Sequence, residues 1–419
     1  MSPGAPRQAR KWAENIIYRA AGLPITLRAL TRNDIGAAAV IRRAYARYYW
    51  SMERWQDPVE VLIAILIFPI GILISAIYLS LRNGRSISQT SGTSIPRQFI
   101  DQIWLACSRG ILPPWYYVFA LYFGKRRQVA ESFLQRCETK SGVYILLKRQ
   151  RSSWSPLGDK QAFAHHCERW RLPTVPIFGV AYPDRIEGLA GSRLPSHDLF
   201  VKPIDRCGGR GAERWDYVDE EIFVRPDGLR LSSAALMQHL MLNSADVPRI
   251  IQPRLLTHPA LADLANGALA TVRVLTCLNE QEEPELMAAL FRMAYGNNHT
   301  VDNLHAGGIG SRVELATGEL SAATNLGMVA NIGWLARHPT SGAAIEGRVI
   351  PRWPEVCALA KRAHQAFSDR LFVGWDIAVL CDGPCLVEGN YGPDVDIMQR
   401  HCSIGLCNQR FGQLLAWHL

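Results

Sequence analysis

The longest uninterrupted hydrophobic stretch of the chain lies in its amino-terminal part. Residues 61–81, with the sequence VLIAILIFPIGILISAIYLSL, contain no charged side chain. A helix needs about 20 apolar residues to cross the hydrocarbon core of a bilayer, so the stretch predicts a membrane segment over residues 59–81. The alternative is a buried core helix, but this run is long for one and has no polar face.

The centre and the flanks of this stretch bear on its topology. Pro69 and Gly71 favour a kink or a helix–break–helix at the middle. Arginines stand on both sides, so a single crossing would leave one basic flank on the wrong side of the membrane. We therefore favour a re-entrant hairpin, with both flanks cytoplasmic, over a single crossing. In either topology the arginines should attract anionic lipid headgroups.

The segment that follows is predicted to be mostly helical up to residue 150. Residues 85–96 are polar and rich in turn formers, which indicates a linker. Residues 97–138 carry helical patterns that Pro113-Pro114 divides into two helices, and their aromatic side chains form either an interfacial belt or a small helical core. Residues 142–147 (GVYILL) are a short apolar run consistent with a buried strand.

After residue 150 short strands, glycine turns and spaced helices alternate. Helices are expected over 160–171 and 353–370. Residues 287–294 are apolar and fit a strand or a helix. Strands are expected over 173–180, 199–203, 249–255, 270–278, 373–380 and 385–390. This mixture predicts an α+β domain over residues 151–419, preceded by a basic region (1–58), the membrane segment (59–81) and a linker and helical region (82–150).

Composition excludes several classes of protein. Hydrophobic residues make up 48% of the 419 residues, which excludes a disordered chain. The ten cysteines are scattered without a C-x-x-C pair, which disfavours a disulfide scaffold or zinc site and indicates reduced thiols.

The net charge is +9, but ten basic and only four acidic residues lie among the first 58, beside the membrane segment. With no nucleic-acid motif present, nucleic acid is not an expected partner. A cleaved signal peptide is not expected either.

The carboxyl-terminal pair of strands carries the first candidate chemistry. Glu388 and Asn390 are two residues apart, so their side chains share one face of a strand. A hairpin turn at Asp382-Gly383, with Gly383 in a left-handed bulge position and residue 380 opposite 384, pairs Asp376 with Glu388. Carboxylate and amide oxygens are ligands that Mg²⁺ prefers, with phosphate oxygens completing its shell. The alternative is the polar outer face of an ordinary hairpin.

A glycine-rich loop follows an earlier strand. Lys202 stands at the end of the apolar run LFVKP, and Gly208, Gly209 and Gly211 come soon after it. Glycines let backbone N–H groups approach phosphate oxygens, and a nearby lysine adds positive charge. The loop matches neither the P-loop nor the Rossmann pattern. By itself it could equally be an ordinary turn, but together with the acidic hairpin it points to nucleotide binding.

The order of these motifs resembles the ATP-grasp enzymes. The resemblance rests on Lys160 in LGDK, Lys202 in FVKP, the CGGRG loop, Arg273 in TVRV, Arg292, the stretch NLHAGGI at 303–309, and Asp376 followed by Glu388-Gly389-Asn390. The TVRV…FR…NxxxGG run is similar to the ribosomal-protein glutamate ligases. From about residue 97 the chain looks most like the sugar-transfer-associated ATP-grasp branch, which is linked to cell-surface polysaccharide synthesis.

The resemblance implies two α+β subdomains that grip ATP between them, with Mg²⁺ as the metal. Lys160 and Lys202 would bind the phosphates, Gly208, Gly209 and Gly211 would form the lid loop, and residues 251–255, including Gln252 and Leu255, would form the adenine hinge. Asp376, Glu388 and Asn390 would hold Mg²⁺. Arg273 and Arg292, joined by Asn303, would steady the transferred phosphoryl group. Pro253 departs from the pattern by removing one hinge donor. The usual amino-terminal substrate domain is replaced by the membrane segment and helices.

These features lead us to expect a membrane-associated ATP-grasp ligase whose catalytic domain lies on the cytoplasmic face. Its substrates would be ATP, a carboxylate and an amine, the latter two linked to a saccharide, and membrane lipid would be a partner. A kinase that phosphorylates a sugar or lipid hydroxyl is the first alternative, and a non-enzymatic nucleotide-binding membrane module is the second. The oligomeric state is open.

Overall fold

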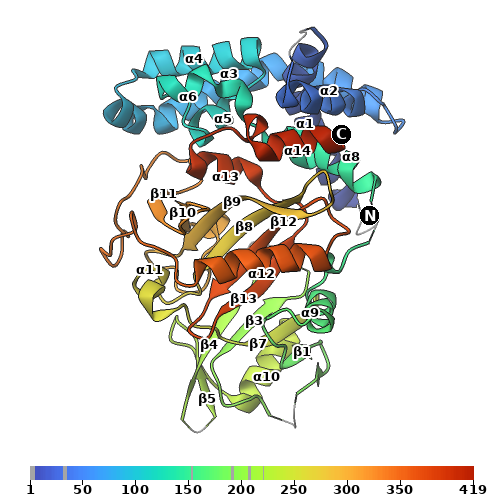
Figure 1. Cartoon of the computed structure of the whole chain (residues 1–419). Helices are drawn as coiled ribbons and strands as arrows, with labels where there is room; N and C mark the ends of the chain where they lie inside the picture. Colours follow the sequence, from blue (N-terminus) through green and yellow to red (C-terminus); the bar gives the residue numbers. More distant parts are fainter. Residues whose placement is uncertain (1–4, 32–34, 152–153, 190–192, 206–208, 220) are drawn as a thin grey trace.

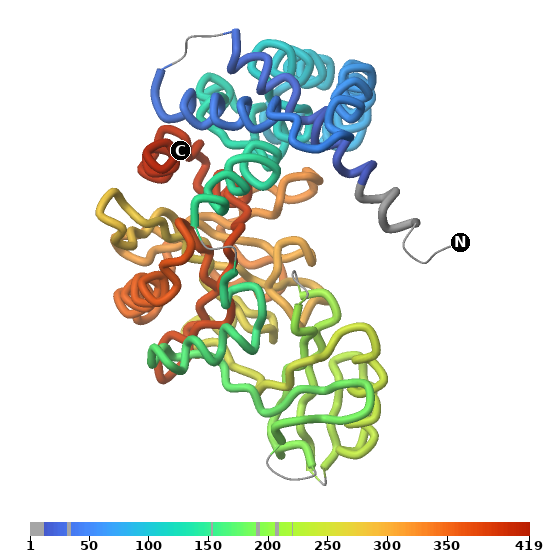
Figure 2. The backbone as a smooth tube through the Cα atoms, turned by 90° about the vertical axis from the view of Figure 1, so that its right-hand side faces the viewer, coloured from blue at the N-terminus to red at the C-terminus, as the bar shows by residue number. Residues whose placement is uncertain are grey.

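The computed structural model describes residues 5–31, 35–151, 154–189, 193–205, 209–219 and 221–419. It has three parts: a layer of helices at one end, a six-stranded sheet in the middle and a seven-stranded sheet at the far end (Figures 1 and 2). Both sheets are accompanied by helices, so the expected α+β class is confirmed. The predicted glycine-loop residue Gly208 lies outside the described residues.

The layer of helices is formed by the amino-terminal third of the chain. Its members are α1 (Ala5–Thr31), α2 (Ala37–Tyr49), α3 (Asp57–Ser91), α4 (Ile95–Arg109), α5 (Pro113–Val118), α6 (Gly124–Gln128), α7 (Arg136–Glu138) and α8 (Tyr144–Arg149), with a short 3₁₀ turn η1 (Ala130–Ser132) and a π-helical segment η2 (Thr139–Val143) between them. Gly92 and Gly110 end α3 and α4 in left-handed conformations, which glycine adopts without steric cost. The break expected at Pro113-Pro114 is present, but residues 97–138 form the four helices α4 to α7 rather than the two expected.

Helix α3 corrects two expectations. It runs without interruption for 35 residues from Asp57 to Ser91, so the hairpin break expected at Pro69 and Gly71 is wrong. A proline removes one hydrogen bond of the ladder, but the packing of α3 against α1 and α4 holds the helix on both sides of it. The linker expected over residues 85–96 is also wrong, because α3 continues to Ser91 and α4 begins at Ile95.

The strand expected over residues 142–147 is helical instead. Val143, Tyr144 and Leu147 are buried, and their spacing is that of one helix face. Gly142 makes room for Tyr45 of α2, since a Cβ there would lie 2.1 Å from the tyrosine ring. A short apolar run fits a strand or a helix equally well, so only the packing partner decides. The aromatic residues Tyr116, Tyr117 and Tyr122 lie in a buried cluster, as the small helical core required.

The six-stranded sheet is antiparallel, in the order β11-β10-β9-β8-β12-β13. Helix α12 (Trp353–Ala366) covers one face, and α13 (Val395–Cys402) and α14 (Arg410–His418) lie on the other (Figure 1). Residues 287–294 prove to be strand. The bounds are β8 (Thr271–Leu278), β9 (Pro284–Met293), β10 (Ile309–Val313), β11 (Leu320–Thr324), β12 (Phe372–Val379) and β13 (Pro384–Asn390).

The hairpin of β12 and β13 has the predicted pairing at its functional end. Asp376 stands opposite Glu388, and Gly374 opposite Asn390. At the turn the prediction was off by one residue, because Val379 rather than Leu380 pairs with Pro384. A bulge between Asp376 and Ile377, opposite Val387 of β13, restores the register. Gly383 has φ +148°, a positive value that favours glycine but is not the left-handed helical conformation expected.

The seven-stranded sheet has the order β2-β1-β7-β3-β4-β5-β6. Its core is formed by Trp215 and Phe223 of the sheet together with Leu236 and Leu240 of α10 (Ser233–Leu242). The strand bounds are β1 (Gly179–Ala181), β2 (Ile186–Glu187), β3 (Leu199–Pro203), β4 (Glu213–Val218), β5 (Ile222–Val224), β6 (Arg230–Ser232) and β7 (Arg249–Pro253). The strand expected over 173–180 is thus mostly extended chain. The remaining helices are α9 (Lys160–Arg169) and α11 (Ala262–Ala265), with turns η3 (Pro156–Gly158), η4 (Pro259–Leu261), η5 (Leu304–Ala306) and η6 (Leu406–Asn408).

Candidate active site

A cavity of about 1400 Å³ lies between the two sheets. Its lining contains every residue predicted from the sequence for nucleotide, metal or transferred group except Gly211, which lies off the lining, and Gly208, which is not described. The predicted residues that line it are Lys160, Lys202, Gly209, Gln252, Leu255, Arg273, Arg292, Asn303, Asp376, Glu388 and Asn390. The volume exceeds the roughly 300–1,000 Å³ common for a single small ligand, so the cavity has room for two substrates.

Two lysines enter the cavity from the side of the seven-stranded sheet. On β3 the side chains of Leu199 and Val201 are buried in the core of that sheet, so the alternation of the strand sends Lys202 to the opposite face. Lys160 is the first residue of α9, where the side chain of Asp159 caps the helix by accepting bonds of 2.8 Å from two backbone N–H groups. Its Nζ donates to the carbonyl oxygen of Ile204 at 3.0 Å.

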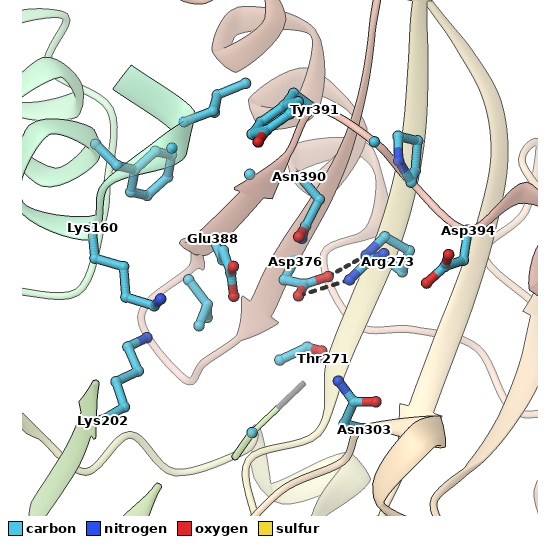
Figure 3. A pocket seen from close by; sticks show the side chains of 18 of the residues that line it. Lys160, Lys202, Thr271, Arg273, Asn303, Asp376, Glu388, Asn390, Tyr391 and Asp394 are labelled. Carbon is cyan, nitrogen blue, oxygen red and sulfur yellow. Dashed lines mark hydrogen bonds and ion pairs between the residues drawn. The ribbon is translucent and has the colours of Figure 1, made fainter. Parts of the chain in front are cut away.

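The two ammonium groups converge on Glu388 of β13 (Figure 3). Burial lowers the pKa of Lys202 to about 8, and the nearby charge of Lys160 acts in the same direction. The carboxylates of Glu388 and Asp376 oppose this effect. A lysine this poorly solvated gains an additional partner when an anionic group such as phosphate enters the cavity.

On the central sheet, Asp376 is held by two arginines. Asp376 and Arg273 are directly opposite on β12 and β8, and the guanidinium of Arg273 binds both carboxylate oxygens (Figure 3). Nη2 of Arg292, from β9, lies 3.0 Å from Oδ2 of the same carboxylate. Burial raises the pKa of Asp376, but the two arginines outweigh it and keep the pKa below the ordinary value.

A second carboxylate joins this network and was missed from the sequence. The backbone N–H and the hydroxyl of Thr271 both donate to Oδ2 of Asp302, at 2.9 and 2.5 Å. The same hydroxyl accepts a 2.6 Å bond from Nη2 of Arg292. Burial raises the pKa of Asp302. The available signals were the position of Thr271 two residues before Arg273 and that of Asp302 beside Asn303.

The acidic hairpin fits a hard cation by its donor set. Asp376 and Glu388 are opposite each other, and Asn390 follows on the same face of β13, which gives two carboxylates and an amide oxygen. Nδ2 of Asn390 is buried and has no hydrogen-bond partner, which marks the amide as available for a further interaction. The described part of the chain has no group of three or more His, Cys, Asp and Glu side chains that could hold a metal, so the amide is essential to the set. A cation at Asp376 would share its oxygens with Arg273 and Arg292.

The glycine loop bends toward the central sheet. Gly209 and Gly211 have φ of +71° and +74°, conformations that favour glycine. A Cβ at Gly209 would lie 3.1 Å from the side chain of Val301, so the absence of one lets the loop close on this segment. The carbonyl oxygen of Gly211 accepts a bond from Arg249.

The predicted hinge lies at the end of β7. Nε2 of Gln252 donates to the carbonyl oxygen of Val175 at 3.3 Å, and Gln252 lines the cavity together with Phe200 and Leu255. Arg254 fixes the strand end by binding Asp198 at 2.9 Å and Asp216 at 3.0 Å. The hinge segment therefore lines the cavity with both polar and apolar side chains.

The far end of the cavity is walled by helices that precede the sheets. Arg136, Lys140, Tyr144 and Lys148 line it, and no sequence motif had indicated them. Arg136 binds Asp394 at 2.8 Å, Lys140 binds the same carboxylate, and the hydroxyl of Tyr144 donates to the carbonyl oxygen of Pro393 at 3.2 Å. Burial, with repulsion by Asp394, raises the pKa of Asp396 to about 6. Asp394, which Arg136 and Lys140 bind, lies beyond Arg273 on the side away from the lysines (Figure 3).

Comparison with known proteins gives one family. Residues 140–412 match the sequence model of a family described as sugar-transfer associated ATP-grasp. No curated protein matches the chain.

Solved structures resemble the chain at low identity. The L-amino acid ligase from Bacillus licheniformis is 8% identical over 62% of this chain and 47% of its own, with a TM-score of 0.36. The D-alanyl-alanine synthetase A from Vibrio cholerae is 9% identical over 62% and 64%, with a TM-score of 0.37. The ATP-grasp ligase PsnB, solved with its minimal precursor, Mg and ADP, is 13% identical over 62% and 58%, with a TM-score of 0.32. The chain spans less than two thirds of each.

Proposed function

Because the chain belongs to the sugar-transfer-associated ATP-grasp family and has the ATP-grasp fold, we propose that it is a ligase that uses ATP and Mg²⁺ to join a carboxylate to an amine. One observation carries the proposal. A single cavity unites two lysines, a hairpin with two carboxylates and an amide, and two arginines. The described lining holds no cysteine or serine that could act as a nucleophile, which suits a reaction that depends on positioning and electrostatics.

ATP is assigned to the side of the cavity that carries the lysines. The adenine would occupy the slot beside Gln252 and Leu255, and the phosphates would meet Lys160 and Lys202 beneath the loop that contains Gly209 and Gly211. Asp376, Glu388 and Asn390 would hold Mg²⁺, which when bound neutralises charge on the phosphates. Lys202 can respond strongly to the nucleotide because it is poorly solvated without one.

The carboxylate is assigned to the far side, between Arg273 and the helical wall. One of its oxygens bonds to the γ-phosphorus while the bond from that phosphorus to the β,γ-bridging oxygen breaks, so ADP leaves and an acylphosphate forms. The amine nitrogen then bonds to the acyl carbon as the bond from that carbon to the phosphate oxygen breaks, and the departing phosphate takes the proton that the nitrogen loses. Arg273, Arg292 and Asn303 would stabilise the negative charge that develops on the transferred group.

The cellular setting is part of the proposal. The description of the family links it to sugar transfer, which supports a saccharide-linked substrate and a role in cell-surface polysaccharide biosynthesis. Helix α3 is long and apolar enough to associate with a membrane. The site needs the cytoplasmic pool of ATP, so we place the catalytic domain on the cytoplasmic face of the membrane.

Hydroxylamine provides the experiment, because it attacks an acylphosphate whatever the natural amine is. The full chain in detergent is incubated with Mg·ATP, hydroxylamine and a panel of sugar acids and amino acids, and both ADP and hydroxamate are measured. A ligase gives hydroxamate and ADP in equal amounts, and only with a suitable carboxylate. Phosphate transfer to a hydroxyl without any amine would establish the kinase instead.

Matched variants tie the activity to the site. Glu388→Gln keeps the shape of the side chain but removes the negative charge and one of the two oxygen donors, which leaves Asp376 as the only carboxylate of the set, so hydroxamate formation should fall at least a hundredfold. Glu355→Gln changes an exposed glutamate at the start of α12 and should leave activity unchanged. If the two variants retain the same activity, Glu388 has no part in the metal site.

A further inference from the structure

Helix α3 presents two different faces. One face is buried by protein in two stretches, each at intervals of three or four residues: Asp57, Val61 and Ala64 in the first, and Ile72, Ala76, Leu79, Asn83 and Ile87 in the second. Between the two stretches no residue of the helix is buried. The opposite face is an exposed hydrophobic stripe, formed by Val59, Leu62, Ile65, Leu66, Ile67, Ile70, Leu73, Ile74, Ile77, Tyr78 and Leu81. We call these eleven residues the α3 stripe. Contiguous exposed apolar surface of this kind marks a site of interaction.

Both ends of α3 are fixed to the rest of the protein. At the start, Asp57 binds Arg19 of α1 at 2.9 Å, and Glu60 binds Arg54 at 2.6 Å. Toward the end, Asn83 accepts a bond from the backbone N–H of Ala330 at 3.0 Å and donates to Met328 at 3.3 Å, in the connection between β11 and α12. The helix is therefore part of the layer and not a separate anchor.

The covering helices carry polar and charged groups beside the apolar run. Gln102 of α4 donates to the hydroxyl of Ser80 at 2.9 Å, and Asp101 of the same helix binds Arg97 at 2.9 Å. Arg28 of α1 donates to the carbonyl oxygen of Ser108 at 3.2 Å. If residues 61–81 crossed the hydrocarbon core with these contacts intact, the side chains of α1 and α4 would enter it as well, at a high cost in solvation.

The length, position and charge of α3 favour an orientation parallel to the membrane surface over a crossing. At 1.5 Å per residue, α3 is about 52 Å long, well beyond the roughly 30 Å of hydrocarbon. It lies across one end of the molecule, at the opposite end from the seven-stranded sheet (Figures 1 and 2). From residue 61 to residue 100 the chain has three arginines and no acidic residue, and Arg82 and Arg85 are exposed beside the α3 stripe. Such a surface complements anionic lipid headgroups.

We propose that the chain binds the membrane in plane, with α3 lying in the interface of one leaflet and the α3 stripe facing the acyl chains. The occupant of the exposed face is thus a lipid surface that contains anionic lipid. This inference rests on the proposed membrane location and replaces both a crossing and a hairpin by a layer that stays on one side. The catalytic cavity then stands above the membrane, because the helices that wall its far end belong to the same helical layer.

The depth of three positions in the bilayer tests the orientation. A fluorescent noncanonical residue replaces Leu62, Ile70 or Leu81, one at a time, and the full chain is bound to vesicles with 30 mol% anionic lipid. Lipids brominated at different acyl depths then locate each probe by quenching. Binding in plane predicts similar depths, about 5–10 Å below the headgroups, at all three positions. A probe at Leu242, exposed on α10, serves as the control and should not be quenched.

Each other outcome rejects a defined part of the reasoning. A crossing would put Ile70 about 12 Å deeper than Leu62, because eight residues of helix separate them, and this result overturns the in-plane orientation alone. No binding to vesicles in flotation overturns the membrane location as well.

Charge variants give an independent readout. The double variant Leu66→Glu/Ile70→Glu changes only exposed side chains of the α3 stripe, so its thermal unfolding should match wild type while vesicle affinity falls at least tenfold. Leu242→Glu should leave vesicle binding unchanged. If the double variant keeps wild-type vesicle affinity, the α3 stripe is not the lipid-binding face.

Discussion

Replacing Lys202 by methionine should stabilise the protein while weakening its binding of ATP. In the folded chain, burial lowers the pKa of Lys202 from 10.5 to about 8. This difference corresponds to about 3 kcal/mol that the charged form costs in the absence of nucleotide. Methionine has a similar length and no charge, so Lys202→Met should raise the free energy of unfolding at pH 7 by up to this amount.

The gain should depend on pH in a defined direction. Between pH 8 and 10.5 the unfolded chain holds a proton on Lys202 that the folded chain has released, so wild-type stability rises with pH across this window. The advantage of Lys202→Met should therefore shrink from about 3 kcal/mol at pH 7 to roughly half of that at pH 9.5. Affinity for ATP should fall about ten- to a hundredfold, the range of a lost charged hydrogen bond.

Denaturant unfolding at pH 7 and 9.5 and calorimetry with Mg·ATP measure the two effects on the full chain in detergent. Lys361→Met, at an exposed lysine of α12, is the matched control and should change neither quantity. Two results would contradict this reasoning: a lower stability of nucleotide-free Lys202→Met at pH 7, or an equal gain in stability at both pH values. Either result would show that burial does not destabilise the charged form of Lys202. Unchanged affinity for ATP would remove Lys202 from the nucleotide site.

Two further substitutions probe contacts that only the structure reveals. Thr271→Val removes the hydroxyl shared by Arg292 and Asp302, so the free energy of unfolding should fall by about 1–3 kcal/mol, and turnover should fall with it. Thr271→Ser keeps the hydroxyl and should preserve both stability and turnover. Equal behaviour of the two variants would contradict the network. Gly405→Ala places a Cβ 2.3 Å from the backbone of Ser132 and should lower the free energy of unfolding by about 1–3 kcal/mol. Gly333→Ala places its Cβ in open space and should leave stability unchanged. Equal thermal midpoints of the two variants would contradict the close packing at Gly405.

The acidic hairpin shows what the sequence can specify. Two apolar strands and an Asp-Gly turn leave few registers, and the period of two decides which side chains share a face. The pairing of Asp376 with Glu388 follows, even though the turn and the bulge each differ from the simplest form. Local rules thus place the candidate metal ligands because hairpin partners are close in sequence.

Contacts between distant segments were beyond such rules. Arg273 pairs with Asp376 because β8 lies beside β12, a neighbour relation that neither strand encodes by itself. The same applies to Thr271 and Asp302, and to the helical wall formed by Arg136 and Lys140. Pro69 shows the reverse case, in which a local rule predicts a feature that the fold lacks. A proline favours a break in a helix, but α3 packs against its neighbours and continues through Pro69.

The family match begins at residue 140, which suggests that the catalytic domain could fold without the preceding helices. The structure argues against this. One buried cluster joins Ile25, Ile41, Tyr45, Tyr49 and Val61 of the first three helices to strands β8, β9 and β12 and to helices α13 and α14. Burying each such side chain contributes about 1.5–3 kcal/mol, so removing all five forfeits about 8–15 kcal/mol, as much as the whole stability of a typical domain.

A fragment of residues 97–419 should therefore aggregate rather than fold as a soluble enzyme. The full chain and the fragment are purified in the same detergent and compared by size-exclusion chromatography and thermal unfolding. The full chain should be monodisperse with a cooperative transition, and the fragment should elute as aggregate without one. A monodisperse fragment that unfolds at the same temperature as the full chain and binds Mg·ATP as tightly would show that the catalytic domain does not need the helical layer for its stability. The exposed core of the fragment is the physical reason to expect otherwise, since α2 packs directly against α14 beneath the central sheet.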